Sequence, residues 1–251
     1  MFKDNTDESW EKIGKNDPYY GVLTFDKYRT NNLDASGRIG FFESGTQHMV
    51  ELVERVECNF GKLSKNTAVD FGCGVGRLAL PLAKDIGFSR VVCVDISQSM
   101  LAEAKKSAGE FGINNIEFVV ADDSLAGLKE EYDFIHSFIV FQHIPVKRGE
   151  MIIKHLINRL SSGGVAALQM PFSRKVGWLR KLANFIRVHI RPLHVIANIL
   201  QSRPWNEPPM QMNRYNINTV LRIVFECGIS DVKIKLLNEG GNIGAYLFVQ
   251  K

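Results

Sequence analysis

The stretch Val69-Asp70-Phe71-Gly72-Cys73-Gly74-Val75-Gly76-Arg77 decides the fold of this chain. An apolar lead-in ends in an acid, glycines follow at alternate positions, and an apolar helical pattern begins at Leu78. The pattern predicts a strand, a tight turn and a helix start, because glycine lets the backbone adopt positive φ and pass close to a ligand. In an open α/β sheet such a turn lies beyond the carboxyl end of a strand, where nucleotide-like ligands bind.

The spacing of the glycines separates two classes of ligand. A dinucleotide fingerprint reads G-x-G-x-x-G and serves a pyrophosphate, whereas this chain reads D-x-G-x-G-x-G from Asp70 to Gly76. An acid before the turn would repel a pyrophosphate and suits a cationic ligand such as S-adenosylmethionine, which carries a sulfonium and an ammonium group. A glycine turn of any parallel α/β protein is the plainer alternative, so the elements that follow must decide.

Further strands follow at the spacing of a doubly wound α/β fold. Residues 90–95 predict a buried parallel strand that ends in Asp95, about 20 residues past the turn, where a carboxylate can bind a ribose diol. A helix with Met100 on its apolar face comes next. The other predicted strands are 116–120, 132–138, 162–170, 231–237 and 243–249, the last two as a hairpin around Glu239-Gly240-Gly241-Asn242.

These motifs resemble those of the class I S-adenosylmethionine-dependent methyltransferases, over about residues 45–170 and 215–251. The resemblance rests on the glycine motif, residues 94–101, Ala121-Asp122-Asp123 and Leu160-Ser161-Ser162-Gly163-Gly164. It implies an α/β fold: a Rossmann-like seven-stranded sheet in the order 3-2-1-4-5-7-6, with the last strand antiparallel, helices on both faces and a helical insert after strand 5. It also implies a small-molecule methyltransferase with S-adenosylmethionine as its cofactor.

The resemblance assigns cofactor roles to the motif residues. Asp70 and Ser137 would lie at the methionine end of the cofactor, and Asp95 would accept hydrogen bonds from both ribose hydroxyls. Asp122 and the backbone of Asp123 would bind adenine, although one of this pair equally suits a cap of the next turn. The full predicted set is Asp70, Phe71, Gly72, Cys73, Gly74, Gly76, Asp95, Ile96, Met100, Asp122, Asp123 and Ser137.

His143, in Phe141-Gln142-His143-Ile144-Pro145, is the candidate general base. It follows the fourth strand, in the loop that borders the acceptor pocket of the family, and imidazole titrates near neutral pH. A histidine that caps the next helix or packs beneath the loop is the alternative. His136 lies inside the fourth strand and is expected in the core. The Asn-Pro-Pro-Tyr motif of amino-group methylases does not follow that strand, and we expect an oxygen acceptor, such as a sugar or phenolic hydroxyl.

Length and composition suit one α/β domain with additions, since the chain has 251 residues and 45% apolar content. We expect a methyltransferase domain over 45–251, whose first helix is capped by Ser44, and an N-terminal extension over 1–44. Its aromatic residues predict an ordered segment that covers the active site, or, as the alternative, only the sheet edge. No stretch approaches 18 uncharged apolar residues, and the start lacks the apolar core of a signal peptide.

The four cysteines do not have metal-ligand spacing, so we expect no metal and a reducing, cytoplasmic setting. The positive charge is concentrated instead: residues 171–206 hold seven of the 31 basic residues and none of the 27 acids. This segment lies in a helical basic insert, 173–209. Its amphipathic part, 173–203, suits the roof of a pocket for an acidic acceptor, a peripheral contact with an anionic membrane, or a dimer or packing helix pair.

The expected partner is therefore a small-molecule acceptor, acidic or lipid-linked, and no nucleic-acid module is visible. Two rival functions stay open. A nicotinamide-dependent oxidoreductase is opposed by the glycine spacing and the terminal hairpin. A non-catalytic protein that binds S-adenosylmethionine would share the same pocket. The oligomeric state does not follow from the sequence, and a dimer stays open.

Overall fold

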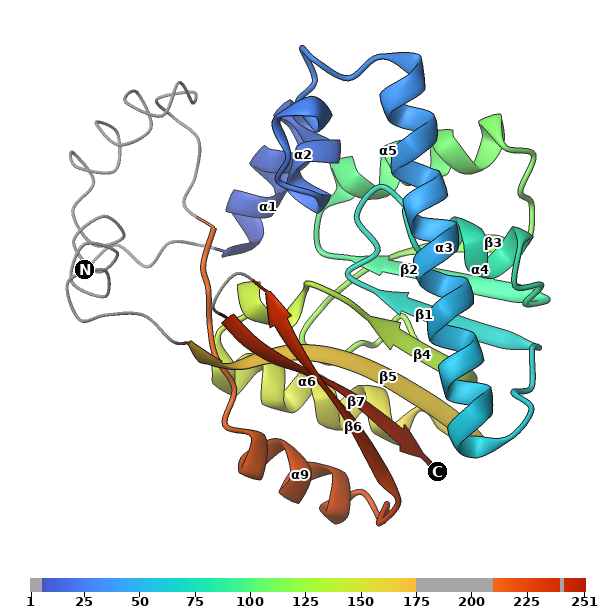
Figure 1. The fold of residues 1–251 in the computed structure, drawn as a ribbon, viewed down its shortest axis with the longest axis vertical. Coiled ribbons are helices and arrows are strands. Elements are labelled where there is room, and N and C mark those ends of the chain that lie inside the picture. Colours follow the sequence, from blue (N-terminus) through green and yellow to red (C-terminus); the bar gives the residue numbers. More distant parts are fainter. Residues whose placement is uncertain (1–5, 175–209, 240–241) are drawn as a thin grey trace.

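A seven-stranded sheet in the order β3-β2-β1-β4-β5-β7-β6 crosses the protein (Figure 1). The computed structural model describes residues 6–174, 210–239 and 242–251. The strands are β1 Thr67–Phe71, β2 Arg90–Asp95, β3 Ile116–Val120, β4 Tyr132–Ser137, β5 Leu160–Arg174, β6 Val232–Glu239 and β7 Asn242–Gln250. Strands β1 to β5 pair in parallel, and β7 runs antiparallel to both β5 and β6. The predicted strand order and antiparallel last strand are confirmed.

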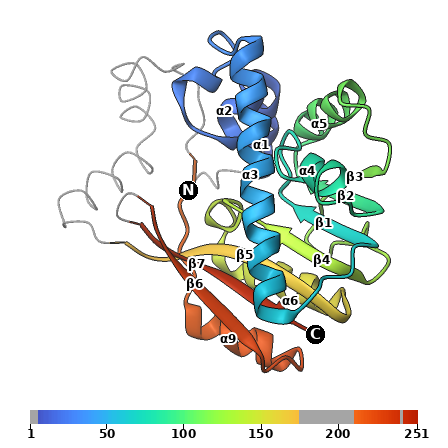
Figure 2. The same cartoon turned by 45° about the vertical axis from the view of Figure 1, so that its right-hand side comes forward.

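Helices cover both faces of the sheet (Figure 2). One buried cluster joins the sheet to α3 (Ala35–Phe60), α4 (Ala79–Lys84) and α5 (Gln98–Glu110). The other joins it to α6 (Val146–Asn158) and α9 (Ile217–Glu226). Because strand side chains alternate between faces, Ala68 packs in the first cluster and Val69 in the second. The short elements are α1 Thr6–Asn16, α2 Pro18–Val22, η1 Asp26–Tyr28 and η2 Phe141–His143.

The first long helix begins earlier than predicted. Asp34 is its N-cap, and its side chain accepts a hydrogen bond from Gly37 N at 2.6 Å. Ser44 lies inside the helix, where its hydroxyl donates to the Phe41 carbonyl, so the prediction of a cap at Ser44 is wrong. Three glycines in 37–45 weaken the helical signal of the first turns. The expected boundary between 44 and 45 therefore falls within α3.

Strand β5 also runs further than predicted, to Arg174 instead of Met170. Pairing with β7 continues past Pro171, with a register shift between Pro171 and Ser173. Proline cannot donate to a ladder and is tolerated at such irregularities. The basic insert lies outside the described residues over 175–209, as does the centre of the predicted hairpin turn at 240–241.

Gly45 marks the closest approach of α3 to the glycine motif. A Cβ on Gly45 would lie 2.0 Å from the Arg77 carbonyl oxygen, whereas Gly40 on the same helix has open space around it. We expect Gly45→Ala to lower the free energy of unfolding by about 1–3 kcal/mol through overpacking. Gly40→Ala should leave it unchanged or raise it by about 1 kcal/mol. Urea denaturation compares the two variants, and equal stabilities would show that α3 can move away from Arg77.

Candidate active site

The glycine turn lies at the carboxyl end of β1, in the middle of the sheet. Gly72, Gly74 and Gly76 have φ angles of +74°, +54° and +86°, a region that favours glycine. The backbone N–H groups of Gly72 and Cys73 donate to the Val94 carbonyl of β2 at 2.7 and 3.1 Å. The predicted turn is therefore present and is tied to the neighbouring strand.

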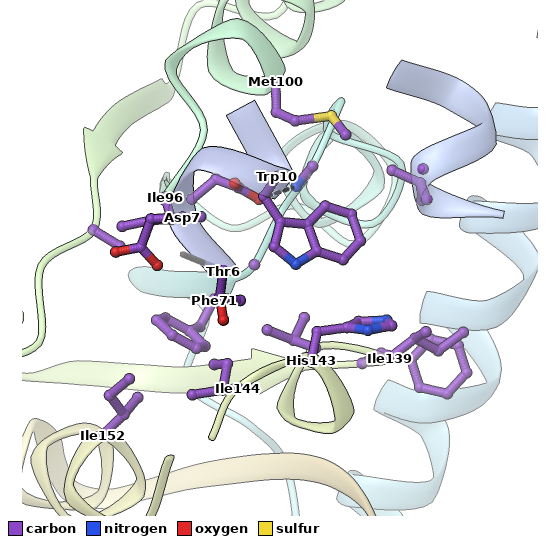
Figure 3. Close-up of a pocket in the computed structure, with 18 of the residues that line it drawn as sticks. Thr6, Asp7, Trp10, Phe71, Ile96, Met100, Ile139, His143, Ile144 and Ile152 are labelled. Atoms are coloured by element: carbon purple, nitrogen blue, oxygen red, sulfur yellow. Dashed lines mark hydrogen bonds between the residues drawn. The ribbon is translucent and has the colours of Figure 1, made fainter. Parts of the chain in front are cut away.

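A pocket opens over this turn, and α1 lies across it (Figure 3). The predicted residues that line the pocket are Phe71, Gly72, Gly74, Asp95, Ile96, Met100, Asp122 and His143. The predicted residues Asp70, Cys73, Gly76, Asp123 and Ser137 lie outside this lining. The structure thus gathers eight of the thirteen predicted positions around one cavity.

Asp95, at the end of β2, joins the glycine turn to the next helix. One carboxylate oxygen accepts from Gly74 N at 2.8 Å, and the other accepts from Ser97 N at 2.9 Å. Burial raises the pKa of Asp95 to about 6, although both backbone hydrogen bonds favour the ionised form. At pH 7 the pocket therefore holds a fixed, mainly ionised carboxylate next to the turn.

Asp70 lies beneath the turn, with 2% of its surface exposed. Its Oδ1 accepts from Nδ1 of His136 at 2.9 Å. Nε2 of His136 lies 3.1 Å from the Tyr246 hydroxyl, which in turn lies 3.1 Å from Nε2 of His48. We call these four residues the buried polar chain. Its contacts confirm that His136 is a core histidine and explain how its polar atoms are satisfied.

The loop after β3 uses its two acids differently. Oδ1 of Asp122 accepts from the backbone N–H and the hydroxyl of Ser124, at 2.8 and 2.6 Å. Asp122 therefore caps the turn, which is the second of its two predicted roles, while it also borders the pocket. Asp123 accepts from Nε of Arg148. The same guanidinium donates to both carboxylate oxygens of Asp7 in α1, at 2.6 and 3.2 Å.

His143 lies in η2, on the wall of the pocket, and is 7% exposed. Its Nδ1 donates to the Gln211 carbonyl at 2.8 Å, which leaves Nε2 to accept from the side-chain amide of Gln142 at 3.1 Å. The Trp10 ring meets the imidazole edge-on, with centroids 4.9 Å apart. Burial lowers the pKa of His143 to about 4, so the ring is neutral at pH 7.

The pocket residues that were not predicted include Trp10, Ile139 and Arg148. Figure 3 shows Trp10 between Met100 and His143.

The neighbouring Glu11 fixes α1 to the start of α5. Its carboxylate accepts from Ser99 N at 3.1 Å and from both the Ser99 and Ser97 hydroxyls. Burial opposes ionisation of Glu11, but these hydrogen bonds prevail and lower its pKa to about 2. The polar α1 pattern gives no sign of these contacts, because its partners lie far along the chain.

Known proteins with similar sequences are named as methyltransferases. The methyltransferase domain family matches residues 68–164. The magnesium-protoporphyrin O-methyltransferase of Synechocystis is 32% identical over 145 residues, which cover 55% of this chain and 60% of that protein. A ubiquinone biosynthesis O-methyltransferase of Rickettsia canadensis is 26% identical over 147 residues, covering 57% and 59%. The chain spans about half to three fifths of the length of the curated relatives it matches.

The likeness in fold covers more of the chain than the likeness in sequence. The crystal structure of the Synechocystis magnesium protoporphyrin IX methyltransferase with bound S-adenosylhomocysteine superimposes with a TM-score of 0.59. The match covers 96% of this chain and 99% of that one, at 21% identity. The sheet order and helices are those of the Rossmann-like methyltransferase fold. Residues 68–164 match the methyltransferase domain family.

Within 6–174, 210–239 and 242–251, no helix has the length and apolar character needed to cross a membrane. The same residues contain no group of three or more histidine, cysteine, aspartate or glutamate side chains that could hold a metal ion. The proposed membrane contact of 173–203 falls almost wholly on residues outside these ranges.

Proposed function

We propose that the protein transfers a methyl group from S-adenosylmethionine to an oxygen atom of a small-molecule acceptor. The observation that carries this proposal is the meeting of the glycine turn and the Asp95 carboxylate at one pocket. Gly72 and Gly74 have no Cβ atom, so the turn presents bare backbone to the pocket, and glycine tolerates the positive φ of both positions. These residues fit the cofactor, because they offer an acceptor for the ribose hydroxyls and a backbone surface for the methionine part.

The remaining predicted residues would complete the cofactor site. Ile96 and Met100 offer apolar surface for adenine and ribose, and the Asp122 turn closes that end. When bound, S-adenosylmethionine supplies a methyl group already activated by its sulfonium. The protein then has to align the acceptor oxygen and exclude water. His143 would take the proton of a hydroxyl acceptor at Nε2, which requires the Gln142 amide to release that atom.

For the acceptor we propose a largely apolar molecule. The pocket wall is formed by Ile139, Val140, Ile144 and Ile152, and Arg148 lies at its edge, paired with Asp7 and Asp123. Several relatives are named as O-methyltransferases, of magnesium protoporphyrin, of malonyl-acyl-carrier protein and in ubiquinone biosynthesis. These names support an oxygen acceptor of the small-molecule or carrier-linked kind.

The test combines cofactor binding and methyl transfer. We expect calorimetry to show binding of S-adenosylhomocysteine to the full chain. Label from methyl-tritiated S-adenosylmethionine should then appear on one member of a panel that includes magnesium protoporphyrin IX and a precursor of ubiquinone. Tight binding of NAD but not of S-adenosylhomocysteine would favour the oxidoreductase. Binding without transfer to any acceptor would favour the non-catalytic protein.

We also propose that the segment before α3 covers the active site. Asp7 and Trp10 line the pocket from α1. Glu11 holds the middle of this helix on α5, and Arg148 of α6 holds its first turn through Asp7. With its middle and its first turn held by neighbouring helices, α1 is placed to shield a bound ligand from water. Exchange of ligand then requires α1 to move.

This cover predicts a kinetic effect of Arg148. We expect Arg148→Met to speed dissociation of S-adenosylhomocysteine by about threefold to tenfold, because α1 loses a partly exposed ion pair with α6. Stopped-flow displacement measures the rate. Arg222→Met is the matched control, since Arg222 pairs with Glu226 within the exposed side of α9. An unchanged rate in Arg148→Met would show that α1 does not limit ligand exchange.

A further inference from the structure

Ile139 has a backbone conformation that a β-branched residue rarely adopts. Its φ is +61°, in the left-handed region where branched side chains are strained. It lies two residues past the end of β4 and lines the pocket together with Phe138 and Val140. Figure 3 places it beside His143. Such strain persists only where the surroundings hold it, and it gathers at functional sites.

Gln169 of β5 holds Ile139 in this conformation through a hydrogen bond. Its side chain is fully buried, and Oε1 accepts from the backbone N–H of Ile139 at 3.0 Å. Its Nε2 has no hydrogen-bond partner among the described residues. A buried amide with an unpaired donor destabilises a fold relative to an apolar side chain of the same shape. Its presence therefore points to the bond with Ile139 as its role.

Phe138 is held from the same side of the sheet. Its ring lies parallel to that of Tyr246, with an interplanar angle of 2° and centroids 5.6 Å apart. Tyr246 sits directly opposite Gln169 in the β5–β7 register. The buried polar chain fixes its hydroxyl through His136 and His48. One pair of facing residues on β5 and β7 thus supports two consecutive residues of the pocket wall.

Val140 connects this part of the pocket wall to the glycine turn by packing against it. A Cβ on Gly72 would lie 2.2 Å from Cγ2 of Val140, so the valine packs against the bare backbone of the turn. Any rotation of the Ile139 peptide displaces Val140 relative to Gly72. The distance between the wall 138–140 and the turn is therefore set by the conformation of Ile139.

We propose that Gln169 is a positioning residue: by holding Ile139, it keeps the wall 138–140 at the right distance from the glycine turn and so sets the affinity for the cofactor. The inference rests on the proposed function, because it concerns the same pocket. Gln169 touches the wall and reaches the ligand only through it.

The test measures binding of S-adenosylhomocysteine to the full chain by calorimetry. We expect Gln169→Leu to weaken binding about tenfold, because the Ile139 N–H loses its acceptor and the peptide can relax. Adding Ile139→Gly should restore at least about half of that loss on a logarithmic scale, because glycine adopts this φ without strain. A purely structural role of Gln169 would show no such rescue. Gln47→Leu, at an exposed glutamine of α3 paired with Glu51, is the control and should bind like the wild type.

The outcomes separate the two proposals. If the wild type does not bind S-adenosylhomocysteine, the proposed function fails. If the wild type binds and a folded Gln169→Leu variant binds equally well, the inference about Gln169 is overturned. Gln169→Met, which keeps length and volume, replaces the leucine variant if that one does not fold. Should neither fold, recovery of a cooperative thermal transition on adding Ile139→Gly supports the inference, and its absence overturns it.

Discussion

Replacing Asp95 by alanine is expected to weaken binding of S-adenosylhomocysteine by about 1.5–3 kcal/mol, which is roughly tenfold to more than a hundredfold. The carboxylate would accept charge-assisted hydrogen bonds from the ribose hydroxyls. It also holds the N–H groups of Gly74 and Ser97, so its loss loosens the turn as well. Calorimetry at pH 7.5 measures the effect. Asp231→Ala, which removes an exposed ion pair with Lys233, is the matched control.

The pH dependence gives a second readout of the same residue. Burial raises the pKa of Asp95 to about 6, and the ionised form is the better acceptor for hydroxyl groups. Affinity in the wild type should therefore increase as the pH rises from 5 to 7. This increase should vanish in Asp95→Ala. Identical affinities and slopes in both proteins would show that another carboxylate binds the ribose.

Replacing His143 by alanine should slow methyl transfer about a hundredfold, the usual contribution of a general base. The ring lines the pocket, and Nε2 is its one nitrogen that can accept a proton while Nδ1 stays bonded to Gln211. Single-turnover transfer to the acceptor identified by the panel measures the rate. Binding of S-adenosylhomocysteine should stay within about threefold of the wild type, because the predicted contacts of His143 are to the acceptor.

The sign of the pH effect follows from the low pKa of His143. The imidazole accepts a proton only when neutral, and burial lowers its pKa to about 4. The rate of the wild type should be flat near neutral pH and should fall as the pH drops through about 4. Gln142→Leu frees Nε2 and should keep or raise the rate. A normal rate in His143→Ala would mean that the histidine only packs between Trp10 and the Gln211 backbone.

The sheet could be predicted because each of its central strands has a recognisable pattern in the local sequence. Residues 90–95 are a buried apolar run ended by an acid, and the glycine turn that follows 67–71 is a short motif. Helix α3 was harder, because its first turns contain glycines that a tertiary contact explains. Gly45 is required by the passage of the helix over Arg77, and no local pattern reveals that contact.

In the candidate site, too, local motifs could be predicted from the sequence and tertiary contacts could not. Asp95 was found because its distance from the turn is fixed by one strand–helix–strand unit. Asp70 belongs to the glycine motif, but its partner His136 comes from β4, and only the pairing of strands brings them together. Trp10 and Glu11 contact residues more than 80 positions away. The strain at Ile139 is invisible in the sequence, because it belongs to a backbone angle and not to a residue type.

Asp70 has only acceptor atoms, and this dictates the tautomers of two imidazole rings. His136 must carry its proton on Nδ1, so its Nε2 accepts from the Tyr246 hydroxyl. The phenolic oxygen then accepts from His48, whose proton sits on Nε2. Burial, together with the nearby His136 and Arg77, lowers the pKa of His48 to about 3, so His48 stays neutral in mild acid. The motif acid is thus engaged in the interior, and the carboxylate that lines the pocket next to the glycine turn is that of Asp95.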